Sequence, residues 1–515
     1  MKASFWFYVS TLRFVTRFPY TAADSPVNDD DATPQITIAS SSTGAVWEGW
    51  GTSLAWWTNV YGDNEDLAEL FFSMNRNPLV ETSSSVLDLP ALGLNIARYN
   101  VGGSSDNVID DSGQELAMKT SKDMLAYKTM ESYWLDWFST NPATKSWNWN
   151  ADAKQRKMLS LATGFGVNIL EAYSSSPPWW MTKNRATTGG DKGAEDNLMI
   201  SSIDQFALYL ATVVNEAKTR WGVTFNYVEP FNEPMSTTWE FPGTQEGCHF
   251  EAATQNEVVK RLRFHLDQLK MQDVSVSVSD ENSPMQALTS LTSMSENATV
   301  MEAVGKVNTH GNDDTAAYRG PDRVALRKLV SGLSLKLWDS NYVDDDATGL
   351  TLAQSISLDI NEMGVSAFIY GQVLNSGALG LIQCNPWDNW MGEANHKYYV
   401  MAHYSRHIRH GMTIHTSDDA NIVVAFDADN YVLVIVRVNS GAAETKKINI
   451  EQFMPRRDQA TDNWPSRIDT WTTEMNSTDS LYVESGVHTP SLEFKIEFPA
   501  ASVTTMEVHW PTRNS

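Results

Sequence analysis

A short acidic segment follows a predicted strand near the middle of the chain. The strand from Thr224 to Glu229 leads into Pro230-Phe231-Asn232-Glu233-Pro234. The prolines restrict the backbone around Glu233, and a carboxyl group held rigidly at a strand end is suited to act as a general acid. The alternative is a loop glutamate that is merely solvated, because most glutamates are exposed. This segment alone does not separate the two interpretations.

Polar and aromatic residues also follow other predicted strands, and they favour the catalytic interpretation. These segments are Arg98-Tyr99-Asn100, Tyr173-Ser174-Ser175-Ser176-Pro177-Pro178-Trp179-Trp180 and Asn308-Thr309-His310. Together they offer hydrogen-bond donors, a cation and flat aromatic faces. That combination suits a neutral ligand with hydroxyls and C–H faces, as sugars have. We therefore predict a sugar-binding site that includes Glu233.

The elements that position these residues follow from the hydrophobic pattern. Short apolar runs alternate with longer amphipathic runs from about residue 47 to residue 408, as in repeated strand–helix units. One such helix is predicted from Ser202 to Arg220, with Ser202 and Gln205 at capping-box spacing. The predicted strands are 49–55, 93–98, 167–173, 224–229, 274–279, 304–310, 333–340 and 366–370.

Eight parallel strands, each followed by a helix, close into a barrel whose working groups lie at the C-terminal strand ends. An open doubly wound sheet is the alternative, but no Gly-rich dinucleotide fingerprint follows any strand. The fold class predicted is therefore α/β, with a (β/α)8 TIM barrel.

After about Gly411 the hydrophobic period changes to two, as in strands with one buried face. Strands are predicted at 422–426, 431–438, 492–498 and 502–510, with Asp427 to Asn430 as a hairpin turn. These predict a small antiparallel domain, which the strand-like segment 35–39 could join from the other end of the chain. The predicted divisions are 1–23 (possible signal peptide), 24–34 (linker), 35–46 (N-terminal strand of the small domain), 47–410 (barrel) and 411–515 (small antiparallel domain).

The composition excludes several functional classes. The chain has 515 residues, with 63 acidic and 38 basic side chains and a formal charge of −25. Nucleic-acid binding and binding to an anionic membrane surface are both disfavoured by this excess of negative charge. No apolar run reaches the roughly 20 residues that a membrane-spanning helix requires. The chain also contains 19 Trp, 17 Tyr and 19 Phe residues, which indicates a folded protein rather than a disordered acidic one.

Several features of the sequence favour export. Met1-Lys2 is followed by an apolar stretch that resembles an atypical signal peptide, so we expect an extracellular protein. Asn297-Ala298-Thr299 and Asn476-Ser477-Thr478 have the form of glycosylation acceptors. Cys248 and Cys384 allow one disulfide at most, and the sequence leaves open whether they pair.

Weaker signals have structural alternatives. His403 and His407 have the spacing of a helical zinc pair, but a third ligand is missing, so we predict packing rather than metal binding. Asp344, Asp345 and Asp346 are interpreted as a solvated loop, because they lack calcium-loop spacing. The tryptophans expected in the core are Trp147, Trp149 and Trp221. Those considered as sugar platforms, with core packing as the alternative, are Trp56, Trp179, Trp180 and Trp239.

Long motifs make the chain resemble glycoside hydrolase family 30, and within it the fungal endo-β-1,6-galactanase group. They are Trp47-Glu48-Gly49-Trp50-Gly51-Thr52-Ser53-Leu54-Ala55-Trp56-Trp57, Leu94-Asn95-Ile96-Ala97-Arg98-Tyr99-Asn100, Ser176-Pro177-Pro178-Trp179-Trp180-Met181, the Glu229 to Pro234 segment, Gln245-Glu246-Gly247-Cys248-His249-Phe250 and Tyr404-Ser405-Arg406-His407-Ile408-Arg409. The resemblance implies a (β/α)8 barrel with an attached β-sandwich, and a retaining hydrolase of β-linked galactan side chains. It places Glu233 at the acid/base position, with Asn232 as its hydrogen-bonding neighbour.

Two positions depart from the resembled family. A retaining enzyme needs a second carboxylate about 5 to 5.5 Å from the acid, and the family's nucleophile position is occupied here by Asn341. An amide carries no charge and attacks carbon poorly. Gly371 replaces the family's aromatic residue in Tyr370-Gly371-Gln372. Asp339 is predicted on the same strand face as Asn341 but too deep to substitute, whereas the acids at 344–346 could hold a water only in an inverting geometry.

The predicted function is a secreted glycoside hydrolase that resembles an endo-β-1,6-galactanase. The alternative is a galactan-binding protein on the same fold without turnover. The catalytic positions are Glu233 and the altered Asn341. The predicted substrate-binding residues are Trp56, Arg98, Asn100, Trp180, Asn232, Trp239, His310, Tyr342 and Gln372. We expect an oligosaccharide or polysaccharide partner, a monomer, and no metal, cofactor, nucleic acid or membrane.

Overall fold

The computed structural model describes residues 33–75, 77–312, 320–453 and 464–511. The predicted signal peptide, and the linker before residue 33, lie outside the described residues. No helix in the described ranges has the length and apolar content to cross a membrane.

Eight parallel strands form a closed barrel, as the sequence predicts. They are β2 (Gly49–Ser53), β5 (Ile96–Asn100), β8 (Ile169–Tyr173), β9 (Tyr227–Glu229), β10 (Ser275–Glu281), β11 (Val304–Thr309), β12 (Lys336–Tyr342) and β13 (Ala367–Tyr370). Each predicted strand overlaps one of these, and β13 pairs with β2 to close the ring.

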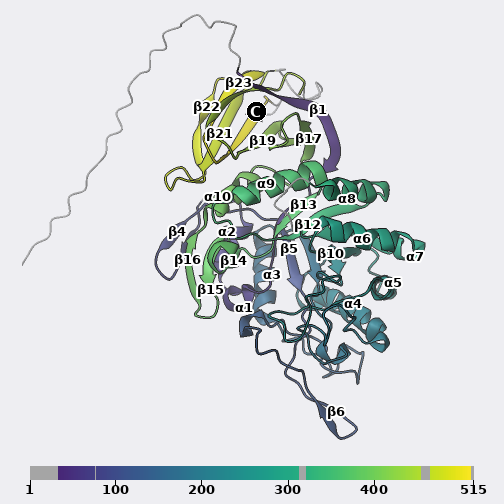
Figure 1. The fold of residues 1–515 in the computed structure, drawn as a ribbon. Helices are drawn as coiled ribbons and strands as arrows, with labels where there is room; N and C mark the ends of the chain where they lie inside the picture. Colours follow the sequence, from purple (N-terminus) through teal and green to yellow (C-terminus); the bar gives the residue numbers. More distant parts are fainter. Residues whose placement is uncertain (1–32, 76, 313–319, 454–463, 512–515) are drawn as a thin grey trace, which may run out of the picture.

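Each barrel strand is followed by a long helix, and these helices surround the barrel (Figure 1). They are α2 (Glu65–Phe72), α3 (Ala153–Phe165), α4 (Ile203–Arg220), α5 (Ala252–Gln268), α6 (Pro284–Ser295), α8 (Pro321–Gly332), α9 (Leu350–Leu358) and α10 (His396–Ser405). The predicted helix at 202–220 is confirmed as α4, and it buries Phe206, Leu210 and Val213. The capping box is wrong, because Ser202 makes no side-chain cap.

Short elements occupy the connections. The short helices are α1 (Thr58–Tyr61), α7 (Ala298–Met301), η1 (Ala126–Lys128), η2 (Trp179–Met181), η3 (Ile200–Ser202), η4 (Asp359–Met363, a π-helix) and η5 (Gly377–Leu379). Small sheets are formed by β3 (Leu79–Glu81) with β4 (Val86–Asp88), by β6 (Ile109–Asp111) with β7 (Gln114–Leu116), and by β14 (Leu374–Asn375), β15 (Ile382–Asn385) and β16 (Trp390–Ala394).

The second domain is a nine-stranded sheet. Its strands are β1 (Gln35–Val46), β17 (Thr413–Ser417), β18 (Ile422–Asp427), β19 (Val432–Asn439), β20 (Glu444–Asn449), β21 (Arg467–Glu474), β22 (Val483–His488), β23 (Glu493–Phe498) and β24 (Ser502–His509). The hairpin between β18 and β19 is confirmed. The prediction that the N-terminal strand joins this domain is also confirmed, because β1 pairs with β17 and β20.

One apolar layer lies inside this domain, and a second lies between the domain and the barrel. Side chains from both ends of the strand order, such as Ile36, Ile435 and Phe494, share one buried cluster, so the sheet folds over as a sandwich. All its pairings are antiparallel except β1 with β20, which makes the sheet mixed. The sandwich packs on the α9 and α10 side of the barrel (Figure 1).

The barrel interior has an apolar layer and a charged layer. The apolar layer contains Ile96, Ile169, Tyr227, Trp338, Ala367 and Ile369. Arg98, Glu171 and Lys306, on three of the strands, are fully buried and joined by ion pairs. This charged layer lies directly beneath the loops that carry the candidate site.

Candidate active site

Glu233 lies in the loop after β9, where the C-terminal ends of the barrel strands meet. Its backbone N–H donates to the carbonyl of Asp280 (2.8 Å), and its own carbonyl accepts from Nε1 of Trp239 (2.8 Å). Its φ of 48° is a left-handed conformation, uncommon for residues other than glycine and frequent at functional sites. These contacts orient the side chain, which remains 23% exposed.

His310, directly after β11, connects Glu233 to the barrel interior. Its Nδ1 lies 3.2 Å from Oε1 of Glu233, and its Nε2 lies 3.7 Å from Oδ2 of Asp280. Burial alone would lower the pKa of His310, but the contacts with Asp280 and Glu233 outweigh burial and raise it to about 9. His310 is therefore a cation at neutral pH, with its Nδ1 directly next to the carboxyl group of Glu233.

Arg98 organises the charged layer beneath this pair. Its guanidinium donates to Oε2 of Glu171 (2.7 Å), Oδ2 of Asp280 (2.8 Å) and the carbonyl of Ser340 (2.9 Å). Burial would raise the pKa of Asp280, but Arg98 and His310 hold it below its usual range. Arg98 is fully buried. It therefore reaches a bound sugar only through its neighbours, and the structure gives it a positioning role instead of the predicted direct contact.

Lys306 and Glu229 complete the layer. Lys306 Nζ lies 2.8 Å from Oε1 of Glu171, and burial lowers the pKa of this lysine to about 8. Burial, together with Asp280 and Glu171, raises the pKa of Glu229 well above its usual range. Its carboxyl group accepts from the amide of Asn308 (3.3 Å). Of the two carboxyl groups in the acidic segment, Glu233 is the accessible one.

Asn341 and Gly371 are adjacent in space. Asn341 lies near the end of β12 and is half-buried. A Cβ added at Gly371 would lie 2.7 Å from Oδ1 of Asn341 and 2.6 Å from Cγ2 of Val343. The Asn341 side chain therefore takes up space that any larger residue at position 371 would need. The two departures noted in the sequence form one contiguous change at the barrel mouth.

Several acids lie near Asn341 in the sequence, and none of them is placed to act as the nucleophile in place of Asn341. Asp339 is fully buried, and burial with the adjacent Asp359 raises its pKa well above the usual range. Asp344 is bound to Lys397 (2.8 Å). Asp346 accepts from the backbone of Thr348 (2.9 Å) and Thr351 (3.0 Å). Asp345 is the one exposed acid of that loop.

Four other predicted site residues surround Glu233 or line the end of β2. Trp56 is half-buried, with Nζ of Lys128 4.4 Å from its ring centre. Gln372 braces the Ala55-Trp56 peptide, because its Oε1 accepts from the Trp56 N–H (3.1 Å) and its Nε2 donates to the Ala55 carbonyl. Trp239 and Asn232 are largely buried next to Glu233. Direct sugar contact by these residues stays a prediction.

Three predicted sugar-binding residues are buried and bonded to other parts of the protein. Asn100 donates to Oγ of Ser175 (3.0 Å). Trp180 donates to the carbonyl of Trp134 (3.0 Å) and is 4% exposed. The hydroxyl of Tyr342 accepts from Ser355 of α9 (3.0 Å), outside the barrel, because the pairing register of β12 shifts between Asp339 and Tyr342. In this arrangement all three support the site instead of contacting a sugar.

The remaining tryptophans and the cysteines pack into the core. Trp147 stacks on Trp149 with 5.4 Å between ring centres, and Trp221 packs against the same cluster, as predicted. Trp179, considered as a sugar platform, is fully buried. Cys248 and Cys384 are free thiols, so the disulfide that the sequence allowed is not formed.

Sequence reasoning did not single out Asp280, Glu171 or Lys306. Asp280 directly follows the predicted strand 274–279. The rule that functional groups follow barrel strands, which led to Glu233, would therefore also have found Asp280. Glu171 and Lys306 lie within strands, where a charged residue gives no sequence signal for its burial in a charged cluster.

Comparison with known proteins identifies the family. The model of O-glycosyl hydrolase family 30 matches residues 33–337. The chain belongs to this family. It is 37% identical to the endo-beta-1,6-galactanase of Hypocrea rufa over 473 residues, which cover 92% of this chain and 94% of that protein. The chain is therefore a member of the glycoside hydrolases, with a carbohydrate polymer as the class of substrate.

Solved structures of low sequence identity confirm the fold. A conserved exported protein from Bacteroides fragilis is 19% identical with a TM-score of 0.70, covering 92% of this chain and 100% of that one. The catalytic domain of the family 30 xylanase C from Talaromyces cellulolyticus is 18% identical with a TM-score of 0.66, covering 92% and 99%. The TIM barrel with an attached sandwich is thus shared with family 30 structures.

In this family 30 chain, His403 on α10 and His407, two residues after the end of α10, attach the sandwich to the barrel. His403 lies within hydrogen-bond distance of Thr505 (2.8 Å) and Thr473 (2.9 Å). His407 lies 2.7 Å from both Glu507 and the hydroxyl of Tyr482. Each ring nitrogen already has a protein partner, which favours packing over zinc binding.

A separate group of possible metal ligands lies on the sandwich of the family 30 fold. Asp469, Glu507 and His509 are the one such cluster in the described ranges. Arg467 lies 2.6 Å from Asp469, so a cation already occupies this position.

Because Glu246 is buried in this family 30 barrel, we predict that the stability of the folded protein depends on pH. Glu246 accepts from Oγ of Ser104 (2.6 Å), and burial raises its pKa to about 8. In the unfolded chain the pKa of this glutamate is about 4.3. Between this pH and pH 8, Glu246 is therefore ionised in the unfolded chain and protonated in the folded protein. Stability is therefore lost as pH rises through this window. Glu246→Gln stays neutral, and we expect its melting temperature to fall less between pH 5 and pH 8.5 than that of the wild type.

Scanning calorimetry across this pH range measures the effect. Glu240→Gln is the matched control, because Glu240 is exposed, and its profile should follow the wild type. Parallel profiles for Glu246→Gln and the wild type would contradict the assignment of a neutral Glu246.

Proposed function

We propose that the protein is a secreted hydrolase of β-1,6-linked galactan, with Glu233 as general acid and base. The observation that carries the proposal is the oriented Glu233 at the barrel mouth, in a chain that aligns over nearly its whole length with an endo-beta-1,6-galactanase. Export is supported by the apolar N-terminal segment and the two glycosylation acceptors. Secretion by the native host, assayed in the culture medium, tests that part of the proposal.

The mechanism assigns the first step to Glu233. Its carboxylic acid protonates the glycosidic oxygen while the bond to the anomeric carbon breaks, and the carboxylate then accepts a proton from the attacking water. His310 keeps the Glu233 carboxyl group in place, with 3.2 Å between Nδ1 and Oε1. Asn341 cannot form the covalent glycosyl intermediate of a retaining enzyme, so we expect slow turnover that depends on direct attack by water.

The paired change at Asn341 and Gly371 favours a second candidate function, which is galactan binding without turnover. Assay of purified wild type on β-1,6-galactan, together with calorimetry on galacto-oligosaccharides, separates the two. Clear turnover eliminates the binding-only function. Binding without product release supports it. If neither occurs, the substrate assignment is wrong.

The role of Glu233 is testable in the Asn341→Glu background, where the second carboxylate is supplied. Adding Glu233→Gln should lower hydrolysis of galactan by about 10²- to 10⁴-fold, the usual contribution of a general acid. Binding should persist, because Gln has the size of Glu and can still pair with His310. Initial rates of reducing-sugar release measure the loss.

Glu240→Gln in the same background is the control. Glu240 is exposed on the same loop, and its variant should retain the parent rate. An unchanged rate with Glu233→Gln would exclude it as the acid.

A further inference from the structure

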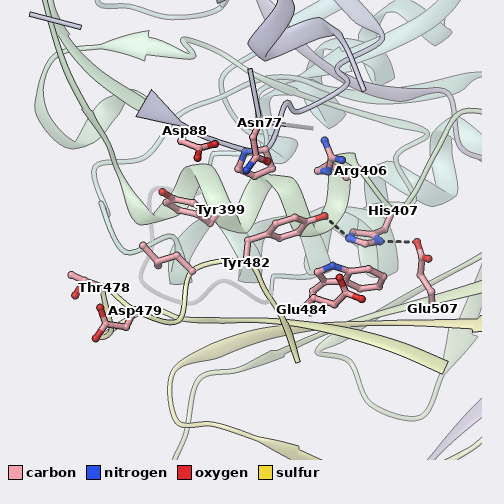
Figure 2. A pocket seen from close by; sticks show the side chains of 13 residues that line it. Asn77, Asp88, Tyr399, Arg406, His407, Thr478, Asp479, Tyr482, Glu484 and Glu507 are labelled. Atoms are coloured by element: carbon pink, nitrogen blue, oxygen red, sulfur yellow. Dashed lines mark hydrogen bonds and ion pairs between the residues drawn. The ribbon is translucent and has the colours of Figure 1, made fainter. Parts of the chain in front are cut away.

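A pocket of about 580 Å³ lies between the barrel and the sandwich, separate from the barrel mouth. This volume is within the range of roughly 300–1,000 Å³ of ligand sites. Helix α10 contributes Tyr399, Arg406 directly follows that helix, β4 contributes Asp88, and the sandwich contributes Trp471 and Glu484 (Figure 2). The reaction of family 30 at the barrel mouth does not assign a ligand to this pocket.

One wall of the pocket is rigid and aromatic. His407 is held between Oε1 of Glu507 and the hydroxyl of Tyr482, each at 2.7 Å, as the dashed lines in Figure 2 show. The ring of Trp471 packs on His407 with 4.5 Å between centres. In the described part of the chain, the Trp471 indole N–H donates to no acceptor. The wall thus offers a fixed aromatic surface with a free donor at its edge.

The remaining lining offers hydrogen-bonding groups that are not committed to ion pairs. Asp88, Asp479 and Glu484 are exposed and pair with no cation among the described residues. Arg406 donates to the carbonyl of Ala91 and pairs with no described carboxylate. The pocket therefore presents several acceptors, a guanidinium donor and the aromatic wall to one shared space that is open to solvent.

We propose that this pocket binds a neutral saccharide chain in addition to the one at the barrel mouth. The C–H faces of a sugar pack on aromatic rings. The hydroxyls of a sugar donate to carboxylates and accept from a guanidinium group. The unpaired carboxylates repel an anionic ligand. The guanidinium of Arg406 repels a simple cation.

Two sources can supply such a chain. One is a free polysaccharide segment, for which the proposed galactan substrate is the candidate; this source rests on the proposed function. The other is a glycan on Asn476, which is exposed in the turn after β21, two residues from Thr478 of the pocket lining. The ligand chemistry is the same in both cases.

Calorimetry with β-1,6-linked galactotetraose tests the proposal on full-length protein made in a bacterial host without N-glycosylation. We expect two binding events in the wild type. Trp471→Ala should weaken one at least tenfold, and Trp56→Ala should weaken the other. The double variant Asp479→Ala/Glu484→Ala, at exposed positions that should not affect folding, should weaken the Trp471-dependent event severalfold. Trp387→Ala, at an exposed tryptophan outside the pocket, is the control and should change neither.

The outcomes separate this proposal from the proposed function. An event that depends only on Trp471 and the two acids supports the pocket and contradicts galactan binding at the mouth. An event that depends only on Trp56 overturns the pocket. In protein from a glycosylating host, loss of the Trp471-dependent event, with recovery in Asn476→Gln, identifies the protein's own glycan as the occupant. Displacement of the saccharide by spermidine in a Glu484-dependent manner would instead indicate a cation site and overturn the proposal.

Discussion

Asn341→Glu is expected to raise the rate of β-1,6-galactan hydrolysis at least about a thousandfold over wild type. Loss of a nucleophile costs about a millionfold in another hydrolase, so restoring a carboxylate opposite Glu233 should recover much of such a deficit. Glutamate adds one methylene and a charge, and both are needed to reach and attack the anomeric carbon. Gly371 carries no side chain to obstruct it. Reducing-sugar release under initial-rate conditions measures the gain.

Asn341→Gln is the matched control for this prediction. It has the length of glutamate without the charge, so it should show no comparable gain. Added azide should also accelerate the wild type, because it can attack the anomeric carbon in place of the missing carboxylate. A wild type that already turns over rapidly, with no gain in Asn341→Glu, would show that position 341 does not determine the rate.

Arg98→Met should destabilise the protein by about 3–5 kcal/mol, the usual cost of removing one partner from a buried ion pair. Methionine keeps an apolar stem of similar length, but Glu171 and Asp280 would lose the guanidinium that holds them at 2.7 and 2.8 Å. Saccharide binding at the mouth should weaken as well, since Arg98 also fixes the carbonyl of Ser340 next to Asn341. Urea unfolding at pH 7 measures the stability change.

Lys192→Ala is the control for Arg98→Met. Lys192 forms an exposed ion pair with Glu195 at 2.6 Å, and exposed pairs contribute little, so no measurable change is expected. If Arg98→Met were as stable as wild type, the charged layer would not support the barrel mouth in the way described.

The sequence was sufficient for the fold because its signals are local. Alternation of strand and helix periods from residue 47 onward predicted the eight barrel strands, and the change to a period of two predicted the second domain. Glu233 and His310 were predicted from the rule that functional groups follow barrel strands. Asn341 was found by comparing residues with a family motif, which needs no coordinates.

Only the tertiary structure decided which polar residues face the ligand and which support them. Arg98 and Asn100 follow the same strand-end rule as Glu233, yet both are buried, because Arg98 bonds to Glu171 of β8 and Asn100 bonds to Ser175 in the loop after β8. Tyr342 points outside the barrel because the register of β12 shifts.

The sequence by itself predicted a sugar-type site at the strand ends, with Asn341 at the position where the resembled family has its second carboxylate. The tertiary structure decided that Asn341 and Gly371 are one local change, that burial raises the pKa of Glu229, and that His310 is charged next to Glu233. The physical reason is that burial and charge depend on neighbours contributed by different strands. Those neighbours are far apart in the chain and meet only when the barrel closes.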